Sequence, residues 1–172
     1  MDDWKTRPMD PALSEVAEQI GRLVIESGRL ERALLALAYT GVRNLGVSPE
    51  RLRGLTARPL VAEVRALARE GAYGGFEVAV LEVVTELAAD EGEDVLSWRN
   101  RYVYAAWERG DDGVFRGITL RDVAGRDLDD GSAPPINEYS IDSMLHLTFT
   151  IAKATDELRR LSQAAFHRVR AA

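Results

Sequence analysis

The sequence predicts an all-α protein: an antiparallel bundle of four to five helices with a small hairpin or extended insertion before the last helix. Two long segments, one near each end of the chain, repeat apolar residues at heptad spacing, which indicates helices that pack along a continuous seam. Helices of that length suit a bundle better than a mixed fold. We expect residues 1–172 to form a single domain, with a core over about residues 10–169 and an insertion at 110–135.

The first helix is expected to begin at Pro11, because Asp10 can cap it and proline suits the first turn. Gly41 is expected to end it, since glycine readily adopts the backbone conformation that closes a helix. The position beside the seam is apolar in each heptad except one, where Glu31 stands. The seam itself continues through four heptads and has one polar member: Leu13, Val16, Ile20, Leu23, Ser27, Leu30, Leu34 and Leu37.

The middle of the chain is predicted to be helical as well. Residues 48–50, Ser-Pro-Glu, start a short helix, and residues 58–70 form another that ends at a cluster of glycines. From Phe76 to Trp107 the apolar pattern keeps one phase across the acidic stretch 90–94, which favours one long helix. A break at Gly92 is the alternative.

The segment ahead of the last helix changes in character. Within residues 110–135, Val114, Arg116, Ile118 and Leu120 alternate with more neutral residues, which predicts a small hairpin or an extended excursion. Ser140 is expected to cap the last helix. That helix carries the second heptad seam: Met144, Leu147, Ile151, Ala154, Leu158, Leu161 and Ala165.

Composition narrows the classes of function. The formal net charge of −6 argues against a protein that grips nucleic acid over a broad surface, although it leaves room for a small basic cleft. The chain has no cysteine, which excludes disulfides and thiolate metal sites. No apolar run reaches the ~18 residues of a membrane span, and the N-terminus lacks the pattern of a secretory signal. We therefore expect a cytoplasmic protein without membrane association.

Neither a metal nor a cofactor is expected. Glu86, Asp90 and Asp94 share one helical face, but the Glu-x-x-His pairs of a carboxylate-bridged metal site are missing. We interpret these three residues as a solvated acidic face. The sequence also contains no glycine-rich phosphate loop of the nucleotide-binding kind.

Arg99 is the main candidate for a functional residue. At ~100° per residue, it falls near the middle of the apolar face of the helix predicted over 95–107, and a guanidinium is rarely buried without a partner. Asn100 and Tyr104 lie along the edge of that face. Glu31 occupies the same kind of position on the first helix, so we expect it to pair with Arg99. The pair is either a structural strut or a device that holds Arg99 towards an anion such as phosphate.

The arrangement Arg99-Asn100, three residues, then Tyr104 resembles the Arg-x4-6-His motif of the HEPN superfamily, with an aromatic residue, Trp107, soon after it. The resemblance implies metal-independent RNA cleavage at a homodimer cleft. It also implies that Arg99 binds the scissile phosphate and that Asn100 orients the neighbouring groups.

Tyr104 stands where that family has its histidine. An ordinary tyrosine has a pKa near ~10 and is a poor general base at neutral pH, so strong ribonuclease activity is not expected. His167 is interpreted as a surface histidine. His146 lies near the start of the last helix, from where it could approach the cleft of another subunit.

Two hypotheses of different classes follow. In the first, the chain is a HEPN-like, RNA-directed homodimer, a weak or degenerate metal-independent endoribonuclease. The resemblance places it in a toxin or defence system, with a protein partner such as an antitoxin. In the second, the chain is a non-catalytic helical interaction or ligand-binding module in which the Arg99–Glu31 pair is structural.

Overall fold

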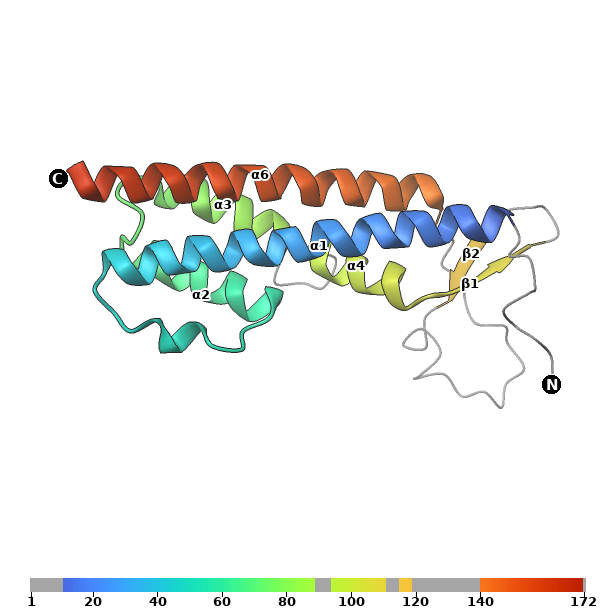
Figure 1. Cartoon of the computed structure of the whole chain (residues 1–172), viewed down its shortest axis with the longest axis horizontal. Coiled ribbons are helices and arrows are strands. Elements are labelled where there is room, and N and C mark those ends of the chain that lie inside the picture. The colour runs from blue at the N-terminus through green and yellow to red at the C-terminus, as the bar shows by residue number, and fades with distance from the viewer. Residues whose placement is uncertain (1–10, 89–93, 111–114, 119–139, 172) are drawn as a thin grey trace.

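The computed structural model describes residues 11–88, 94–110, 115–118 and 140–171. They form the predicted all-α bundle, with a short hairpin ahead of the last helix (Figure 1). The elements in chain order are α1 (Pro11–Asn44), the 3-10 helix η1 (Pro49–Leu52), α2 (Ala57–Arg69), α3 (Glu77–Leu87), α4 (Val95–Tyr104), β1 (Ala106–Arg109), β2 (Phe115–Ile118) and α6 (Ile141–Ala171).

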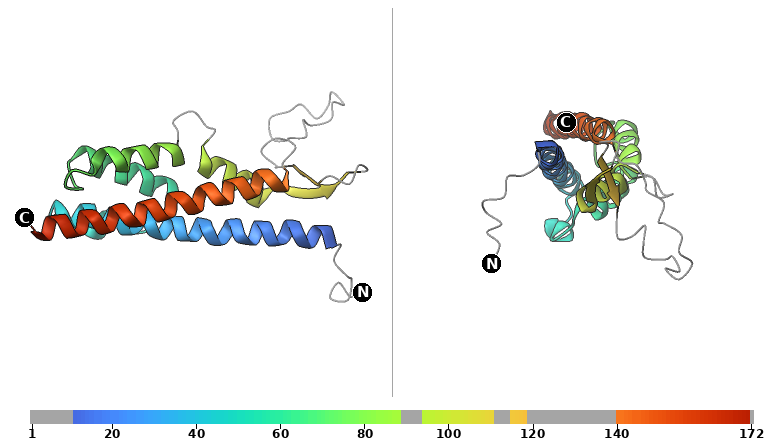
Figure 2. Two further views of the ribbon diagram at one scale, coloured as in Figure 1. Left: turned by 90° about the horizontal axis from the view of Figure 1, so that it is seen from above. Right: turned by 90° about the vertical axis from the view of Figure 1, so that its right-hand side faces the viewer.

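The two seam helices, α1 and α6, lie side by side and run in the same direction, as Figure 1 and the view from above in Figure 2 show. The hydroxyls of Thr40 and Ser162, near their C-terminal ends, are 3.0 Å apart. α2 packs along the second half of α1 and runs in that same direction. At the C-terminal ends of the two helices, the side-chain amide of Asn44 donates to the carbonyl of Ala72, which lies just after α2. α3 and α4 run in the opposite direction to α1, α2 and α6, which is the antiparallel arrangement expected of the bundle (Figure 1).

The heptad positions form the core, as predicted. Among the described residues, most seam members of α1 and α6 are almost completely buried, and side chains from α2 and α3 complete the core. The seam opens at the N-terminal end of α1, where Leu13 is 38 % exposed. The largest fully buried side chains are Tyr73, Leu23, Leu30, Leu34, Leu37, Leu60, Leu67, Leu87, Met144, Ile151 and Leu158.

α1 continues past Gly41, contrary to the prediction that this glycine ends it. A Cβ at Gly41 would lie 3.0 Å from both the Leu67 Cδ1 and the Tyr73 hydroxyl, so the glycine permits close packing within the helix. The helix ends instead at Gly46, whose φ of 66° lies in the left-handed region, and the Val47 N–H donates to the Val42 carbonyl. The two glycines look alike in the sequence because only tertiary contact distinguishes them.

The long helix predicted from Phe76 to Trp107 is two helices, so the alternative of a break is correct. α3 stops at Leu87, and α4 starts after Asp94, whose carboxylate accepts from the Ser97 N–H at 2.6 Å as an N-cap. Residues 89–93, between them, lie outside the described residues. The second helix also ends at Tyr104, and Trp107 belongs to β1.

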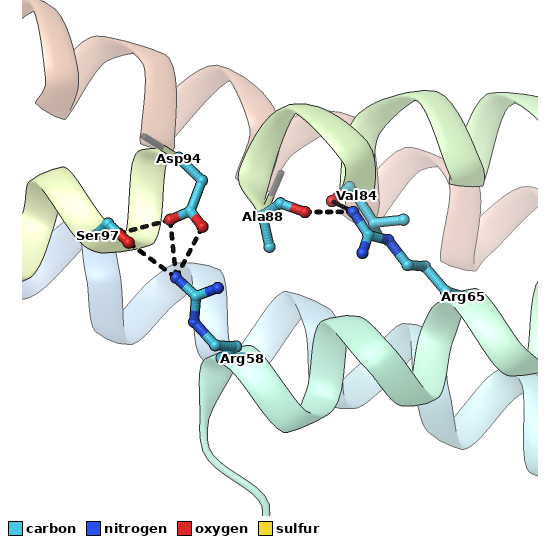
Figure 3. Close-up of polar contacts among 6 residues, drawn as sticks. All are labelled: Arg58, Arg65, Val84, Ala88, Asp94 and Ser97. Atoms are coloured by element: carbon cyan, nitrogen blue, oxygen red, sulfur yellow. Dashed lines mark hydrogen bonds and ion pairs between the residues drawn. The ribbon is translucent and has the colours of Figure 1, made fainter. Parts of the chain in front are cut away.

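α2 holds both sides of this break through two arginines that are seven residues apart (Figure 3). Arg65 donates to the carbonyls of Val84 and Ala88 at the C-terminal end of α3. Arg58 pairs with Asp94 at the start of α4. Two turns of α2 therefore span the interruption, since seven residues rise ~10 Å along a helix.

The predicted hairpin is present but lies earlier in the chain. β1 and β2 pair antiparallel, with Trp107 opposite Gly117 and Arg109 opposite Phe115. Most of the expected insertion, namely 111–114 and 119–135, falls outside the described residues. Within the part of the chain that is described, no helix combines the length and apolar character needed to cross a membrane.

Candidate functional site

A pocket of about 210 Å³ lies where α1, α2 and α4 meet. It combines two arginines, one carboxylate, an amide and the N-terminus of α2. Its lining residues are Ser27, Glu31, Thr56, Ala57, Arg58, Leu96, Arg99 and Asn100. Three of the residues singled out from the sequence, Glu31, Arg99 and Asn100, are therefore brought to one site.

Arg99 is partly buried, as its place on the apolar face of α4 predicts. Its Nη1 donates to the Asn100 Oδ1 at 2.7 Å, so the neighbouring amide orients the guanidinium. Its Nε is buried and has no hydrogen-bond partner among the described residues. A buried N–H of a permanently charged group without an acceptor is unfavourable, and an oxyanion in the pocket that Arg99 lines would help to balance this charge.

Glu31 does not form the expected ion pair with Arg99. Its Oε1 accepts from the Ala57 N–H at 2.9 Å, the first residue of α2. The N-cap residue, Thr56, makes no side-chain cap, so Glu31 performs this role from another helix. Among the described residues, no ion pair within 4.0 Å joins Glu31 to Arg99, although both line the pocket.

Arg58 and Asp94 form the ion pair that the sequence did not reveal (Figure 3). The Asp94 side chain is 0 % exposed, and both of its oxygens accept from the Arg58 Nη2, at 2.7 and 3.0 Å. The same nitrogen donates to the Ser97 Oγ at 2.9 Å. The charge of Arg58 is therefore largely balanced, which leaves Arg99 as the pocket arginine without a carboxylate among the described residues.

The interpretation of Asp94 as part of a solvated acidic face is thus wrong, whereas Glu86 is exposed as expected. The signal that identifies Asp94 is local: an Asp directly before the apolar residues Val95 and Leu96 is typical of a helix N-cap. Asp90 lies outside the described residues. Within the described ranges, no group of three metal-ligating side chains is found.

The remaining predicted site residues lie outside the pocket lining. Tyr104, the last residue of α4, is 73 % exposed. Trp107 stacks on Tyr102 with ring centroids 6.2 Å apart, and its indole N–H donates to the Tyr102 carbonyl at 3.3 Å, which is a packing role. His146 is exposed on α6. Tyr104, Trp107 and His146, which the sequence pattern had grouped with Arg99, are thus not among the residues that line its pocket.

Burial raises the pKa of Tyr102, and a hydrogen bond with Ser143 lowers it in part, so this phenol stays protonated at neutral pH.

The site as a whole offers fixed donors and one fixed carboxylate, which suits binding of a ligand that carries an anionic group. No protein-family model, curated protein or solved structure matches the chain.

Proposed function

We propose that this protein is HEPN-like and RNA-directed, and that it binds a phosphate group of RNA in the pocket between α1, α2 and α4. The observation that carries the proposal is Arg99: a partly buried guanidinium, oriented by Asn100, with a buried Nε that has no acceptor among the described residues. The N-terminus of α2 adds a positive dipole end to the same pocket.

RNA is favoured over a free anion by the surface beside the pocket. Tyr104 is exposed and follows Asn100 by one helical turn, so both lie on one face of α4. An exposed aromatic ring next to a phosphate site suits stacking of a base. The resemblance of the Arg99-Asn100 motif to that of HEPN ribonucleases points to the same class of ligand.

Ribonuclease activity, where present, is metal-independent and weak. The pocket is lined by no histidine, and Tyr104 is not among its lining residues. The proton transfers of RNA cleavage therefore lack the group that performs them in the family. A role in a toxin or defence system, with an antitoxin or other protein partner, is part of this proposal and depends on the resemblance.

The proposal is tested by RNA binding and cleavage with chelator present. Arg99→Ala should weaken RNA binding by about tenfold or more, because charge-assisted hydrogen bonds to phosphate are lost. Arg69→Ala, an exposed arginine at the end of α2, is the matched control and should change binding little. Equal RNA affinity of wild type and Arg99→Ala contradicts the proposal, and any cleavage should disappear in Arg99→Ala.

A second candidate is a non-catalytic interaction or ligand-binding module. It is favoured by the absence of histidine from the pocket lining and by Glu31, which stabilises α2 through the Ala57 N–H. On this reading, wild type binds no RNA, and Arg99→Ala changes only the melting temperature.

We also propose that the protein is a homodimer, and the exposed face of α1 supports this. Leu13 and Val24 are 38 % and 44 % exposed there. Gly21 and Gly28 share the face, and apart from their chain neighbours and the adjacent backbone of α1, no heavy atom of the described residues lies within 4 Å of where their Cβ atoms would be. A glycine inside a helix costs ~1 kcal/mol relative to alanine. Unlike Gly41, neither glycine has a neighbour in the described chain that needs the space.

The face is self-complementary in size. In an antiparallel pair of α1 helices centred near Gly21, Leu13 of one copy meets Gly28 of the other, and Val24 meets Ala17. Large residues thus face small ones on both sides of the two-fold axis. Sedimentation of Gly21→Leu tests this arrangement: we expect a monomer with an unchanged or higher melting temperature. A dimer that survives Gly21→Leu but dissociates with Tyr104→Ser places the interface on α4 instead, as the resemblance implies.

A further inference from the structure

The pocket holds a carboxylate where a pure anion site would exclude one. Glu31 lines it together with Arg58 and Arg99, yet its charge is not paired with either arginine within 4.0 Å among the described residues. A carboxylate beside a bound phosphate repels it. The arrangement is therefore best satisfied by a ligand that carries a hydrogen-bond donor next to its phosphate.

Glu31 is fixed in place to accept such a donor. The hydrogen bond from the Ala57 N–H engages Oε1, and a carboxylate has further lone pairs on its second oxygen. The nearby Ser27 hydroxyl donates to the Leu23 carbonyl at 2.6 Å and not to Glu31. The second oxygen of Glu31 accepts no hydrogen bond among the described residues, and Glu31 lines the pocket. The Asn100 Oδ1, by contrast, already accepts from Arg99.

The size of the pocket limits the ligand further. About 210 Å³ is below the range of pockets that enclose drug-sized molecules, so the site suits one sugar–phosphate unit of a longer chain. In RNA, the 2′-hydroxyl next to the backbone phosphate is both a donor and an acceptor, and it is the group that distinguishes RNA from DNA.

We infer that Glu31 selects ribose over deoxyribose, by accepting a hydrogen bond from the 2′-hydroxyl next to the phosphate that Arg99 binds. This inference rests on the proposed function and adds a specificity-determining residue to it. The sequence suggested Glu31 only as a partner of Arg99, whereas in the structure Glu31 accepts a hydrogen bond from the first residue of α2.

The test is fluorescence anisotropy of one short sequence as RNA, as DNA and as 2′-fluoro RNA, which keeps an acceptor but cannot donate. We expect wild type to bind RNA about tenfold or more tightly than the other two, as for a hydrogen bond to a charged group. Arg99→Ala should weaken binding of all three.

Glu31→Gln separates the two roles of this residue. Glutamine has one acceptor oxygen in place of two, so the Ala57 N–H and the 2′-hydroxyl would have to share it, and its amide nitrogen only donates. We expect RNA to lose its advantage over DNA, or the melting temperature to fall because α2 loses its cap. Glu15→Gln, which removes one exposed charge from the same helix, is the control and should keep the preference for RNA.

The outcomes distinguish this inference from the proposal beneath it. Equal, Arg99-dependent binding of RNA, DNA and 2′-fluoro RNA overturns the role of Glu31 and leaves phosphate binding intact. Absence of Arg99-dependent binding to any of the three overturns both. Should Glu31→Gln fail to fold, the comparison of RNA with 2′-fluoro RNA on wild type decides the question alone.

Discussion

Arg99 shows how a permanent charge is tolerated on an apolar helix face. Its Nη1 donates to the Asn100 amide oxygen, its Nε is buried, and the side chain lines the pocket between α1, α2 and α4. Helical periodicity was sufficient to predict that this side chain points inward. Periodicity was not sufficient to identify the partner of Arg99. Glu31 instead accepts a hydrogen bond from the Ala57 N–H at the start of α2, and no pattern within α1 reveals this contact.

Tyr73 is a second buried polar residue whose behaviour follows from its surroundings. Its ring is fully buried, and its hydroxyl has no hydrogen-bond partner among the described residues. Burial raises its pKa well above the usual value, and the negative charges of Glu63 and Glu77 raise it further. The folded chain therefore keeps this proton at a pH where the unfolded chain has lost it.

We predict that Tyr73→Phe stabilises the protein at neutral pH by up to ~1 kcal/mol, because a buried hydroxyl without a partner is removed. The wild type should lose stability as the pH rises above ~10, where the tyrosine of the unfolded chain ionises, and the variant should lose less. Denaturant unfolding at pH 7 and above pH 10 measures both effects. Tyr39→Phe, at an exposed tyrosine, is the control; a Tyr73→Phe variant less stable at pH 7 contradicts the prediction.

At the scale of elements, the break between α3 and α4 is stabilised from outside the segment that breaks. Arg65 satisfies carbonyls at the end of α3, and Arg58 binds the carboxylate that caps α4. The sequence from Phe76 to Trp107 keeps the phase of a single helix, so the pattern alone does not exclude a continuous one. Two arginines on a third helix favour the interrupted form, because they bind groups that only helix ends expose.

Removing Arg58 should be costly, because it leaves the buried Asp94 carboxylate without its cation. We predict that Arg58→Met lowers the free energy of unfolding by ~1–3 kcal/mol, because Asp94 is buried while Arg58 is 53 % exposed, and that adding Asp94→Asn recovers part of the loss. Urea unfolding of both single variants and the double variant measures the coupling.

The matched control is Arg53→Met, since Arg53 pairs with Glu50 at 3.5 Å on the surface, where both side chains are well exposed. An exposed pair contributes ~0–1 kcal/mol, so this variant should be close to wild type. A double-variant cycle without coupling between Arg58 and Asp94 would show that the pair does not stabilise the break.

At the scale of the whole molecule, the fold depends on a parallel pair of helices from opposite ends of the chain. Among the described elements, α1 and α6 share the longest interface, and all the others lie between them in sequence (Figure 1). A parallel pair cannot be closed by a short turn, so the intervening segments carry the chain back along the bundle. Burial of the α6 seam should therefore stabilise the entire domain.

We predict that Ile151→Ala, at a fully buried seam position of α6, destabilises the protein by ~2–5 kcal/mol in one cooperative transition. Phe149→Ala removes a larger apolar side chain from the same helix, but this side chain is 69 % exposed and the change should cost below ~0.5 kcal/mol. Thermal unfolding followed by circular dichroism compares the two. Similar losses from both variants would mean that the exposed face of α6 is covered in solution.

Periodicity determined the helical class, the two seams and the inward position of Arg99, because each of these depends on spacing within one segment. The relative direction of α1 and α6, the placement of Gly41 beneath Tyr73, and the pairs Glu31–Ala57 and Arg58–Asp94 were decided by tertiary structure. Each of them joins residues that are distant in sequence and satisfies a group that appears only when another element packs against it. Several groups can pair with the same charged side chain, and the packing of the whole domain determines which of them lies close enough to do so.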